Sequence, residues 1–211
     1  ISACLVGAEM CIRDRFTIEE LNANLEDILH ACEQDVQKLI GRKDVSLDLC
    51  SKIENGKLRV DQGVIAGCAG GLYDSIYEAA SILKGHTGGC GDYALSVYPG
   101  SQPIMMELVR TGVIHDLMAS GATVRTAFCG PCFGAGDVPA NGALSIRHTT
   151  RNFPSREGSK PGNGQLSGVA LMDARSIAAT TANGGILTPA TDIDYDPTVP
   201  EYQYDPSSYD T

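Results

Sequence analysis

The chain twice repeats one pattern: a short apolar run, a glycine-containing turn and a helical segment with apolar residues on one face. The first copy occupies residues 63–68 and 72–83, and the second occupies residues 94–98 and 101–113. A strand, a turn and a helix in this order form the repeating unit of α/β proteins. The pattern predicts a three-layer α/β domain, with a mostly parallel sheet and helices on both faces. Ligands of such domains bind beyond the carboxyl ends of the strands.

Other segments extend this pattern on both sides. We expect a helix at 114–120, strands at 122–128, 143–148 and 169–172, and a last helix capped by Asp173. Near the start, Thr17-Ile-Glu-Glu20 matches a capping box, in which the Thr hydroxyl and the Glu carboxylate accept the free amides of a helix start. Apolar residues then recur at helical spacing up to Gly41, so we expect one amphipathic helix there.

At 211 residues, the chain has the length of one domain with a flexible end. Residues 9–15, Glu-Met-Cys-Ile-Arg-Asp-Arg, match one reading frame of a transposon end used in sequencing libraries. We therefore treat residues 1–15 as a candidate non-native segment and expect the domain to occupy residues 16–191. Residues 192–211 contain six acidic residues, three prolines and no Lys or Arg, a composition typical of a linker or tail.

The charge balance excludes several classes of partner. With 26 acidic and 16 basic residues, the net charge of −10 repels nucleic acid and anionic lipid, and no basic stripe offsets it. No apolar stretch approaches the roughly 20 residues that a membrane helix needs. We therefore expect a cytoplasmic protein that binds neither nucleic acid nor a membrane.

Eight cysteines in a chain of this size favour metal or redox chemistry over a disulfide scaffold, because such scaffolds are small and dense in cysteine. Cys129-Gly-Pro-Cys132 is the sharpest local motif. It matches a thioredoxin-like dithiol, but that motif opens a helix, and the three glycines and Pro139 that follow do not sustain one. Of the other six cysteines, Cys32, Cys50 and Cys90 are expected to be small buried apolar groups.

The alternative for this motif is metal ligation. Structural zinc usually needs a second close pair of ligands, and the sequence has no second Cys-x-x-Cys. An iron–sulfur cluster with three protein ligands remains, and Cys68 is the candidate for the third. It is flanked by glycine at a predicted strand end, which leaves room for a bulky inorganic group.

Four motifs together resemble, in order and in spacing, the cluster domain of aconitases and isopropylmalate dehydratases. They are Ile65-Ala-Gly-Cys68, Tyr98-Pro-Gly-Ser101, Ala127-Phe-Cys-Gly-Pro-Cys-Phe-Gly134 and Thr150-Arg-Asn-Phe-Pro-Ser-Arg156. The resemblance covers roughly residues 60–192.

This resemblance implies a [4Fe-4S] cluster held by Cys68, Cys129 and Cys132, with one iron left open. In the family that iron acts as a Lewis acid on the hydroxyl and carboxylate of the substrate, so that the hydroxyl leaves as water. Arg151 and Arg156 match arginines that bind substrate carboxylates, a role suited to the bidentate guanidinium. Ser101 falls in the motif that contributes to substrate binding.

The chain departs from the family pattern in two places. Ala69-Gly70 replaces the usual Thr-Asn after the first ligand, and Thr150 replaces a frequent Asn. Both changes remove side-chain amides near the cluster, where hydrogen bonds tune the potential and the substrate fit. We therefore expect a substrate other than citrate and a closer resemblance to a hydratase-like branch than to the respiratory enzymes.

The family's acid–base residues lie on preceding domains, and its proton-removing serine lies on a separate swivelling domain. None of those motifs occurs here. We therefore expect a hydro-lyase fragment or subunit that acts on a small carboxylic acid together with the remaining domains or subunit. Two alternatives stay open: a non-catalytic iron–sulfur or redox-sensing module, and a thioredoxin-like dithiol oxidoreductase. His148 lies near the arginine motif, but we favour a structural role for it.

Overall fold

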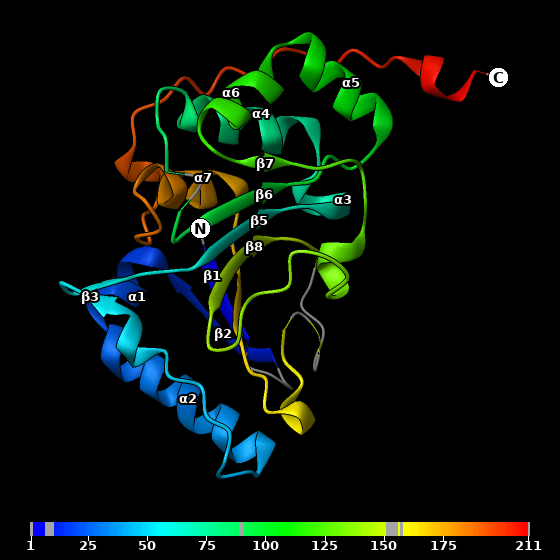
Figure 1. Ribbon diagram of the computed structural model, residues 1–211. Helices are drawn as coiled ribbons and strands as arrows, with labels where there is room; N and C mark the ends of the chain where they lie inside the picture. The colour runs from blue at the N-terminus through cyan, green and yellow to red at the C-terminus, as the bar shows by residue number, and fades with distance from the viewer. Residues whose placement is uncertain (1, 7–10, 89–90, 151–155, 157, 211) are drawn as a thin grey trace.

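A computed structural model describes residues 2–6, 11–88, 91–150, 156 and 158–210 (Figure 1). Its main sheet has seven strands in the order β2-β1-β9-β8-β5-β6-β7, and a small hairpin pairs β3 with β4. The strands are β1 Ser2–Val6, β2 Cys11–Thr17, β3 Ile53–Glu54, β4 Lys57–Leu58, β5 Gln62–Ile65, β6 Ala94–Val97, β7 Thr123–Val124, β8 Leu144–His148 and β9 Gly168–Leu171.

Five strands, β9 to β7 in that order, run parallel, which confirms the predicted α/β class. The central strand β5 ends level with both neighbours, because Ile65 pairs with Val97 of β6 and with His148 of β8. From β5 the chain continues outward to β6 and β7 on one side and later fills β8 and β9 on the other. Such a reversal of strand order is where α/β sheets bind ligands.

The α-helices other than α3 follow the predicted segments, whereas α3 and the 3-10 helices were not predicted. They are α1 Ile18–Ala23, α2 Leu25–Ile40, α3 Gly67–Gly70, α4 Tyr73–Leu83, α5 Gln102–Arg110, α6 Val113–Ala119 and α7 Ala174–Ala182, with η1 Cys50–Lys52, η2 Gly130–Phe133, η3 Pro161–Asn163, η4 Ala190–Asp192 and η5 Pro206–Tyr209.

Both predicted caps are present. The Glu20 N–H donates to Thr17 Oγ1 at 3.0 Å and the Thr17 N–H donates to the Glu20 carboxylate at 2.8 Å, which completes the capping box. Asp173 accepts the first free amides of α7, from Arg175 and Ser176.

Two elements differ from expectation. The single helix expected after Thr17 is broken at Asn24, whose N–H donates to Leu21 O and whose side-chain amide donates to Glu20 O. These local bonds compete with the helical ladder. The strand expected at 122–128 shrinks to β7, because its partner β6 ends at Val97 and offers no pairing for residues 126–128.

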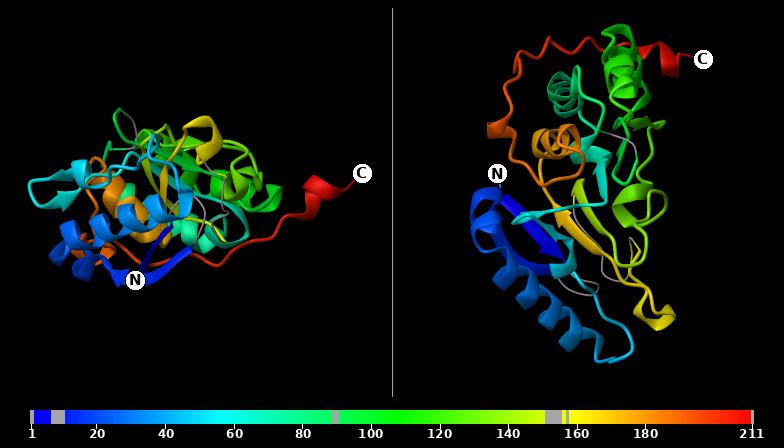
Figure 2. Two further views of the ribbon diagram at one scale, coloured as in Figure 1. Left: turned by 90° about the horizontal axis from the view of Figure 1, so that it is seen from below. Right: turned by 60° about the vertical axis from the view of Figure 1, so that its left-hand side comes forward.

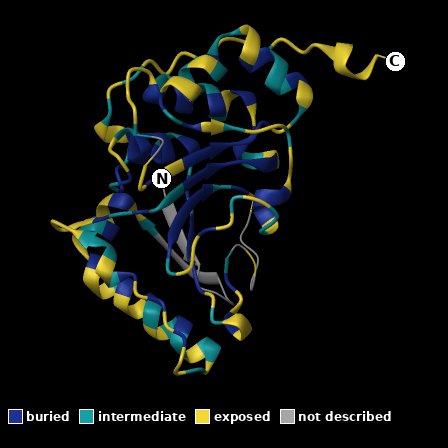
Figure 3. Cartoon of the chain, viewed as in Figure 1, coloured by how far each residue is buried: buried dark blue, intermediate teal, exposed yellow. Residues whose placement is uncertain are grey.

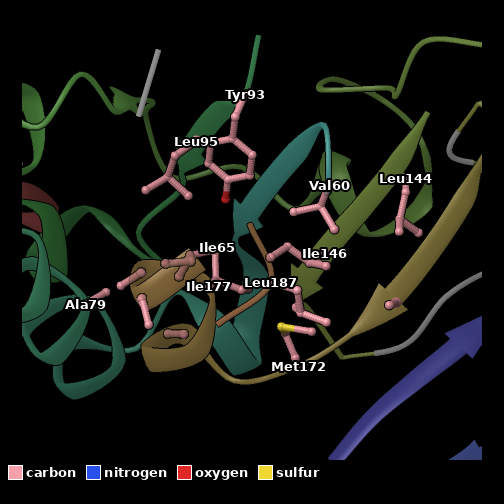
Figure 4. Packing of buried hydrophobic residues seen from close by; sticks show 14 of the residues in the cluster. Val60, Ile65, Ala79, Tyr93, Leu95, Leu144, Ile146, Met172, Ile177 and Leu187 are labelled. Atoms are coloured by element: carbon pink, nitrogen blue, oxygen red, sulfur yellow. The ribbon is translucent and has the colours of Figure 1, made fainter. Parts of the chain in front are cut away.

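The two faces of the sheet are covered differently. On one face, Ile65, Leu95 and Ile146 pack against Ile177 of α7, and Ala79 of α4 packs behind it (Figure 4). Figure 2 shows α4 and α7 next to each other on this side, with α2 apart from them beside the antiparallel strands, and Figure 3 shows that β5 and β6 are largely buried. The opposite face carries polar residues of β8 and is covered by residues 129–137, which within the described chain form a loop with one 3-10 helix.

The two ends of the chain lie on different parts of the domain. β1 pairs antiparallel with β9 and with β2, so residues 2–6 extend the sheet at one edge. Residues 193–210 run along the helices: the Ser81 hydroxyl of α4 donates to Asp196 O at 2.7 Å, and the Tyr202 ring lies 5.4 Å from that of Tyr73. No helix of the described chain is both long and apolar enough to cross a bilayer.

Candidate functional site

Three segments of the described chain start where the central parallel strands end. The turn after β5 carries Cys68, the loop after β6 carries Ser101, and the segment beyond β7 carries Cys129 and Cys132, while Arg156 follows β8 in the sequence. Because β5, β6 and β8 end in register, these loops start at one edge of the sheet. This is the edge at which the sequence predicts a site.

The turn that carries Cys68 packs directly on neighbouring backbone. The Ala66 N–H donates to His148 O at 3.1 Å, and the Gly100 N–H donates to Gly71 O at 2.7 Å. A Cβ added at Gly70 would lie 2.0 Å from His148 O, and one at Gly71 would lie 2.6 Å from the Gly100 nitrogen. Gly70 and Gly71 are therefore required by close packing against β8 and the β6–α5 loop.

The three predicted cysteine ligands lie near one another. Cys132 is buried, and its Sγ lies only 2.9 Å from the place where a Cβ on Gly67 would stand, beside Cys68. Burial raises the pKa of the Cys132 thiol; a hydrogen bond from the Thr150 backbone opposes this, and the charges of Cys129 and Cys68 add to the rise. Cys68 and Cys129 are exposed, and the Cys68 sulfur lies 2.9 Å from the Thr150 hydroxyl.

The donors suit a multi-iron cluster. All three cysteines are free thiols, and thiolates are the usual ligands of such clusters. Four ligands around one zinc ion stand about 4 Å apart. In the described part of the chain, one group of three possible ligands has its ligand atoms all within 4.8 Å of one another, and this group does not include Cys68, Cys129 or Cys132. The sulfurs of these three cysteines are therefore spread more widely. Gly67, with φ +73°, leaves room for the Cys132 sulfur, which would lie only 2.9 Å from a Cβ at this position.

Arg147 holds the cysteine loop on the sheet, a role that the sequence analysis missed. Its fully buried guanidinium donates to Pro131 O at 2.7 Å and to Asp137 O at 2.7 Å. It also donates to Ser145 Oγ at 3.0 Å and to Gln62 Oε1 at 3.2 Å, both on the strands beneath. The sequence contained one signal for this role, since Arg147 is a basic residue inside a predicted strand, between Ile146 and His148. A buried arginine needs several hydrogen-bond acceptors around it.

A second contact fixes the far end of the same loop. The Tyr98 hydroxyl donates a short hydrogen bond to the carboxylate of Asp137, and Arg125 lies 3.9 Å from that carboxylate. Burial and the neighbouring Asp137 raise the pKa of Tyr98 to about 12. Asp137 itself has φ +45°, so the loop turns sharply where the two contacts meet.

The predicted substrate-binding residues are described only in part. The Ser101 hydroxyl accepts the Ile104 N–H at 3.4 Å as the cap of α5, and Ser101 is partly buried at the sheet edge. Arg156 is exposed, while Arg151 lies outside the described residues. His148 Nδ1 accepts the Ala174 N–H at 3.1 Å and burial lowers its pKa, which confirms the structural role expected for it.

The thioredoxin-like alternative loses its structural basis. In the motif Cys129-Gly-Pro-Cys132, Cys129 is the N-cap of η2 and the other three residues lie within it. This 3-10 helix ends after Phe133, and its C-cap Gly134 has φ +83°. A thioredoxin-like dithiol needs a helix whose amino end stabilises the thiolate, and no α-helix follows Cys132 before β8 in the described chain.

Comparison with known proteins gives a consistent result. Residues 13–179 match the model of the aconitase family (aconitate hydratase). The chain is 36% identical over 129 residues to the 3-isopropylmalate dehydratase large subunit of Thermoanaerobacter pseudethanolicus, covering 59% of this chain and 30% of that protein. It is 31% identical over 161 residues to the protein of the same name from Caldanaerobacter subterraneus subsp. tengcongensis, covering 74% and 38%. The chain thus spans about a third of the length of these relatives.

Proposed function

Because the chain belongs to the aconitase family, we propose that it is the cluster-binding portion of a hydro-lyase that adds or removes water at a hydroxy-carboxylic acid. The observation that carries this proposal is the meeting of Cys68, Cys129 and Cys132 at the carboxyl ends of the central strands. The family match includes all three residues.

The three thiolates would hold a [4Fe-4S] cluster, which when bound supplies a Lewis acid for the substrate's hydroxyl and carboxylate. The chain's own residues set where those thiolates stand. Backbone packing at Gly70 fixes the turn of Cys68, and Arg147 fixes the loop of Cys129 and Cys132. The Thr150 hydroxyl, 2.9 Å from the Cys68 sulfur, adds a hydrogen bond that tunes this ligand.

The substrate would bind through charge. Arg151 and Arg156 would pair with its carboxylates, and the Ser101 hydroxyl can still donate a hydrogen bond while its oxygen caps α5. The relatives named above are 3-isopropylmalate dehydratases, so we propose a malate-type dicarboxylic acid as the substrate class. The small residues Ala69 and Gly70 agree with a substrate that makes fewer polar contacts near the cluster than citrate would.

The rest of the enzyme would supply proton transfer. The chain covers about a third of relatives that are named large subunits, so we propose that its partners are the remaining part of such a subunit and a small subunit. The isolated chain should therefore bind a hydroxy acid without turning it over.

Anaerobic reconstitution with iron and sulfide, followed by one-electron reduction with dithionite and electron paramagnetic resonance, tests the proposal, because a [4Fe-4S] cluster is paramagnetic only in the reduced state. We expect a cluster signal that shifts on addition of 3-isopropylmalate, is lost in Cys68→Ser and is retained in the control Cys32→Ala. Arg151→Lys/Arg156→Lys should weaken the acid's effect, because lysine keeps the charge but loses the bidentate fork. No cluster in the folded wild-type chain would overturn the proposal, and a cluster indifferent to every acid would favour the non-catalytic iron–sulfur module. Turnover by the chain alone would refute the fragment interpretation.

A further inference from the structure

A second group of possible metal ligands lies on a separate element, between α2 and η1. His30 and Glu33 stand one turn apart on α2, and Cys50 opens η1, which packs against that helix. The imidazole, carboxylate and thiol ligand atoms all lie within 4.8 Å of one another. Figure 1 shows the segment that carries η1 and β3 running beside α2, away from the loops at the carboxyl ends of the central strands.

Glu33 organises this group. Its Oε1 accepts the backbone N–H groups of Leu49 at 2.5 Å and Cys50 at 2.8 Å, which fixes the η1 segment on the helix. Its other oxygen, Oε2, lies 3.5 Å from His30 Nδ1. The carboxylate is thus oriented by two backbone donors and directs one oxygen toward the imidazole, the arrangement by which outer contacts orient metal ligands.

The surroundings favour a cation. Glu26 and Asp27 line the same hollow, about 480 Å³ in volume, together with His30 and Cys50. Burial is the largest cause that raises the pKa of Cys50 to about 11, and the negative charges of Glu33, Asp48 and Glu26 add to it. The thiol is therefore protonated when nothing is bound. A bound divalent ion would offset the acidic charge and favour the thiolate.

We propose that His30 Nδ1, Glu33 Oε2 and Cys50 Sγ bind one divalent ion of the zinc type, independently of any cluster at the strand ends. Mixed nitrogen, oxygen and sulfur donors suit zinc, which takes four ligands. On binding, the Cys50 sulfur forms a bond to the metal and its proton passes to the buffer. Three protein ligands leave a fourth position for water or for the carboxylate of Asp27.

Cobalt(II) tests the site, because a thiolate bound to Co²⁺ gives a charge-transfer absorption band. The full chain would carry Cys68→Ser, Cys129→Ser and Cys132→Ser, so that the thiols at the strand ends cannot take up added metal. We expect this chain to bind one equivalent of Co²⁺ with a thiolate band, and Zn²⁺ to displace it. In the same background, Cys50→Ser should abolish the band, and His30→Ala should weaken binding at least about tenfold.

The controls separate metal binding from folding. Cys32→Ala alters a cysteine on the same helix that is buried in the core, and it should leave the band unchanged. The His30 side chain is 64% exposed, so His30→Ala should keep the circular dichroism spectrum of the parent. A band that persists in Cys50→Ser, or a folded background chain that binds no Co²⁺, would overturn the proposal.

Discussion

The two segments that carry the cysteine thiols are held in opposite ways. The turn of Cys68 is fixed by backbone lying directly on backbone at Gly70 and Gly71, with hydrogen bonds between main-chain groups. The loop of Cys129 and Cys132 covers the opposite face of the sheet and is fixed there by side chains, chiefly Arg147. The first segment should therefore be sensitive to added volume, and the second to lost hydrogen-bond donors.

The largest effect is expected for Gly70→Ala. Its new Cβ would stand 2.0 Å from the backbone oxygen of His148, which cannot move without disturbing the end of β8. We expect a loss of about 3 kcal/mol or more in the free energy of unfolding, measured by urea denaturation. Gly162→Ala is the matched control, since no atom lies within 4 Å of the added carbon, and it should change stability by less than about 0.5 kcal/mol. Equal stability of the two variants would contradict the backbone-packing account.

A smaller effect is expected for Arg147→Lys. Lysine keeps the positive charge, but its three N–H donors on one nitrogen cannot replace all four hydrogen bonds of the Arg147 guanidinium, and a buried acceptor left without a donor is costly. We expect a loss of about 2 kcal/mol in the free energy of unfolding. The Cys132 thiol, which is buried, should also react faster with a thiol reagent in the folded variant.

Arg125→Lys serves as the control for this pair of measurements. Arg125 lies near the same loop, but its contact with the loop is weak. Its side chain is 51% exposed, and its guanidinium nitrogen is as far as 3.9 Å from the Asp137 carboxylate oxygen. Both stability and Cys132 reactivity should stay near the wild-type values. An unchanged thiol reactivity in Arg147→Lys would show that the arginine stabilises the domain without positioning the loop.

Tyr98→Phe should cost about 1 kcal/mol, because it removes one hydrogen bond to Asp137. Its effect also depends on pH. Burial and Asp137 raise the pKa of Tyr98 from 10.0 to about 12, so its contribution is intact below about pH 10 and is lost as the pH rises through about 12. The stability difference between wild type and Tyr98→Phe should therefore shrink over this range. A constant difference would refute the assignment.

The smallest effect is expected at the antiparallel edge, far from both thiol segments. If residues 1–15 are non-native, their deletion should leave the unfolding midpoint unchanged, because the strands that carry the site pair without β1. Thermal unfolding of the chain from Phe16 onward measures this. A drop of several degrees, the size expected for a loss of about 1 kcal/mol or more, would instead show that pairing of β1 with β9 belongs to the native fold.

The parallel sheet was predictable from the sequence because β5, β6 and β9 are short, largely apolar runs that lead into a glycine turn or a capped helix. The caps at Thr17 and Asp173 were predictable for the same local reason. Glycines that need close approach, such as Gly70, were visible in the sequence only as a departure from a family pattern. Their physical reason, contact with His148 O, depends on a strand that lies far away along the chain.

Other features needed three-dimensional contacts that a sequence pattern does not contain. The break at Asn24 arises from local hydrogen bonds that compete with a well-patterned helix. The role of Arg147 depends on carbonyl groups of residues 131 and 137, which carry no side-chain signal. Cys50 was expected to be a buried apolar group, yet it is only half-buried and lies beside Glu33 and His30.

The parallel pairing of β5 with β8 also constrains the order of events during folding. It joins Gln62 to Ser145, 83 residues apart, and only this pairing brings the turn of Cys68 beside the segment that Arg147 anchors. Long-range parallel pairing forms slowly, because a large loop must close before any contact compensates for the lost entropy. Before this pairing forms, Cys68 is therefore separated from the pair Cys129 and Cys132, and iron delivered at that stage would meet at most two of the three thiols together.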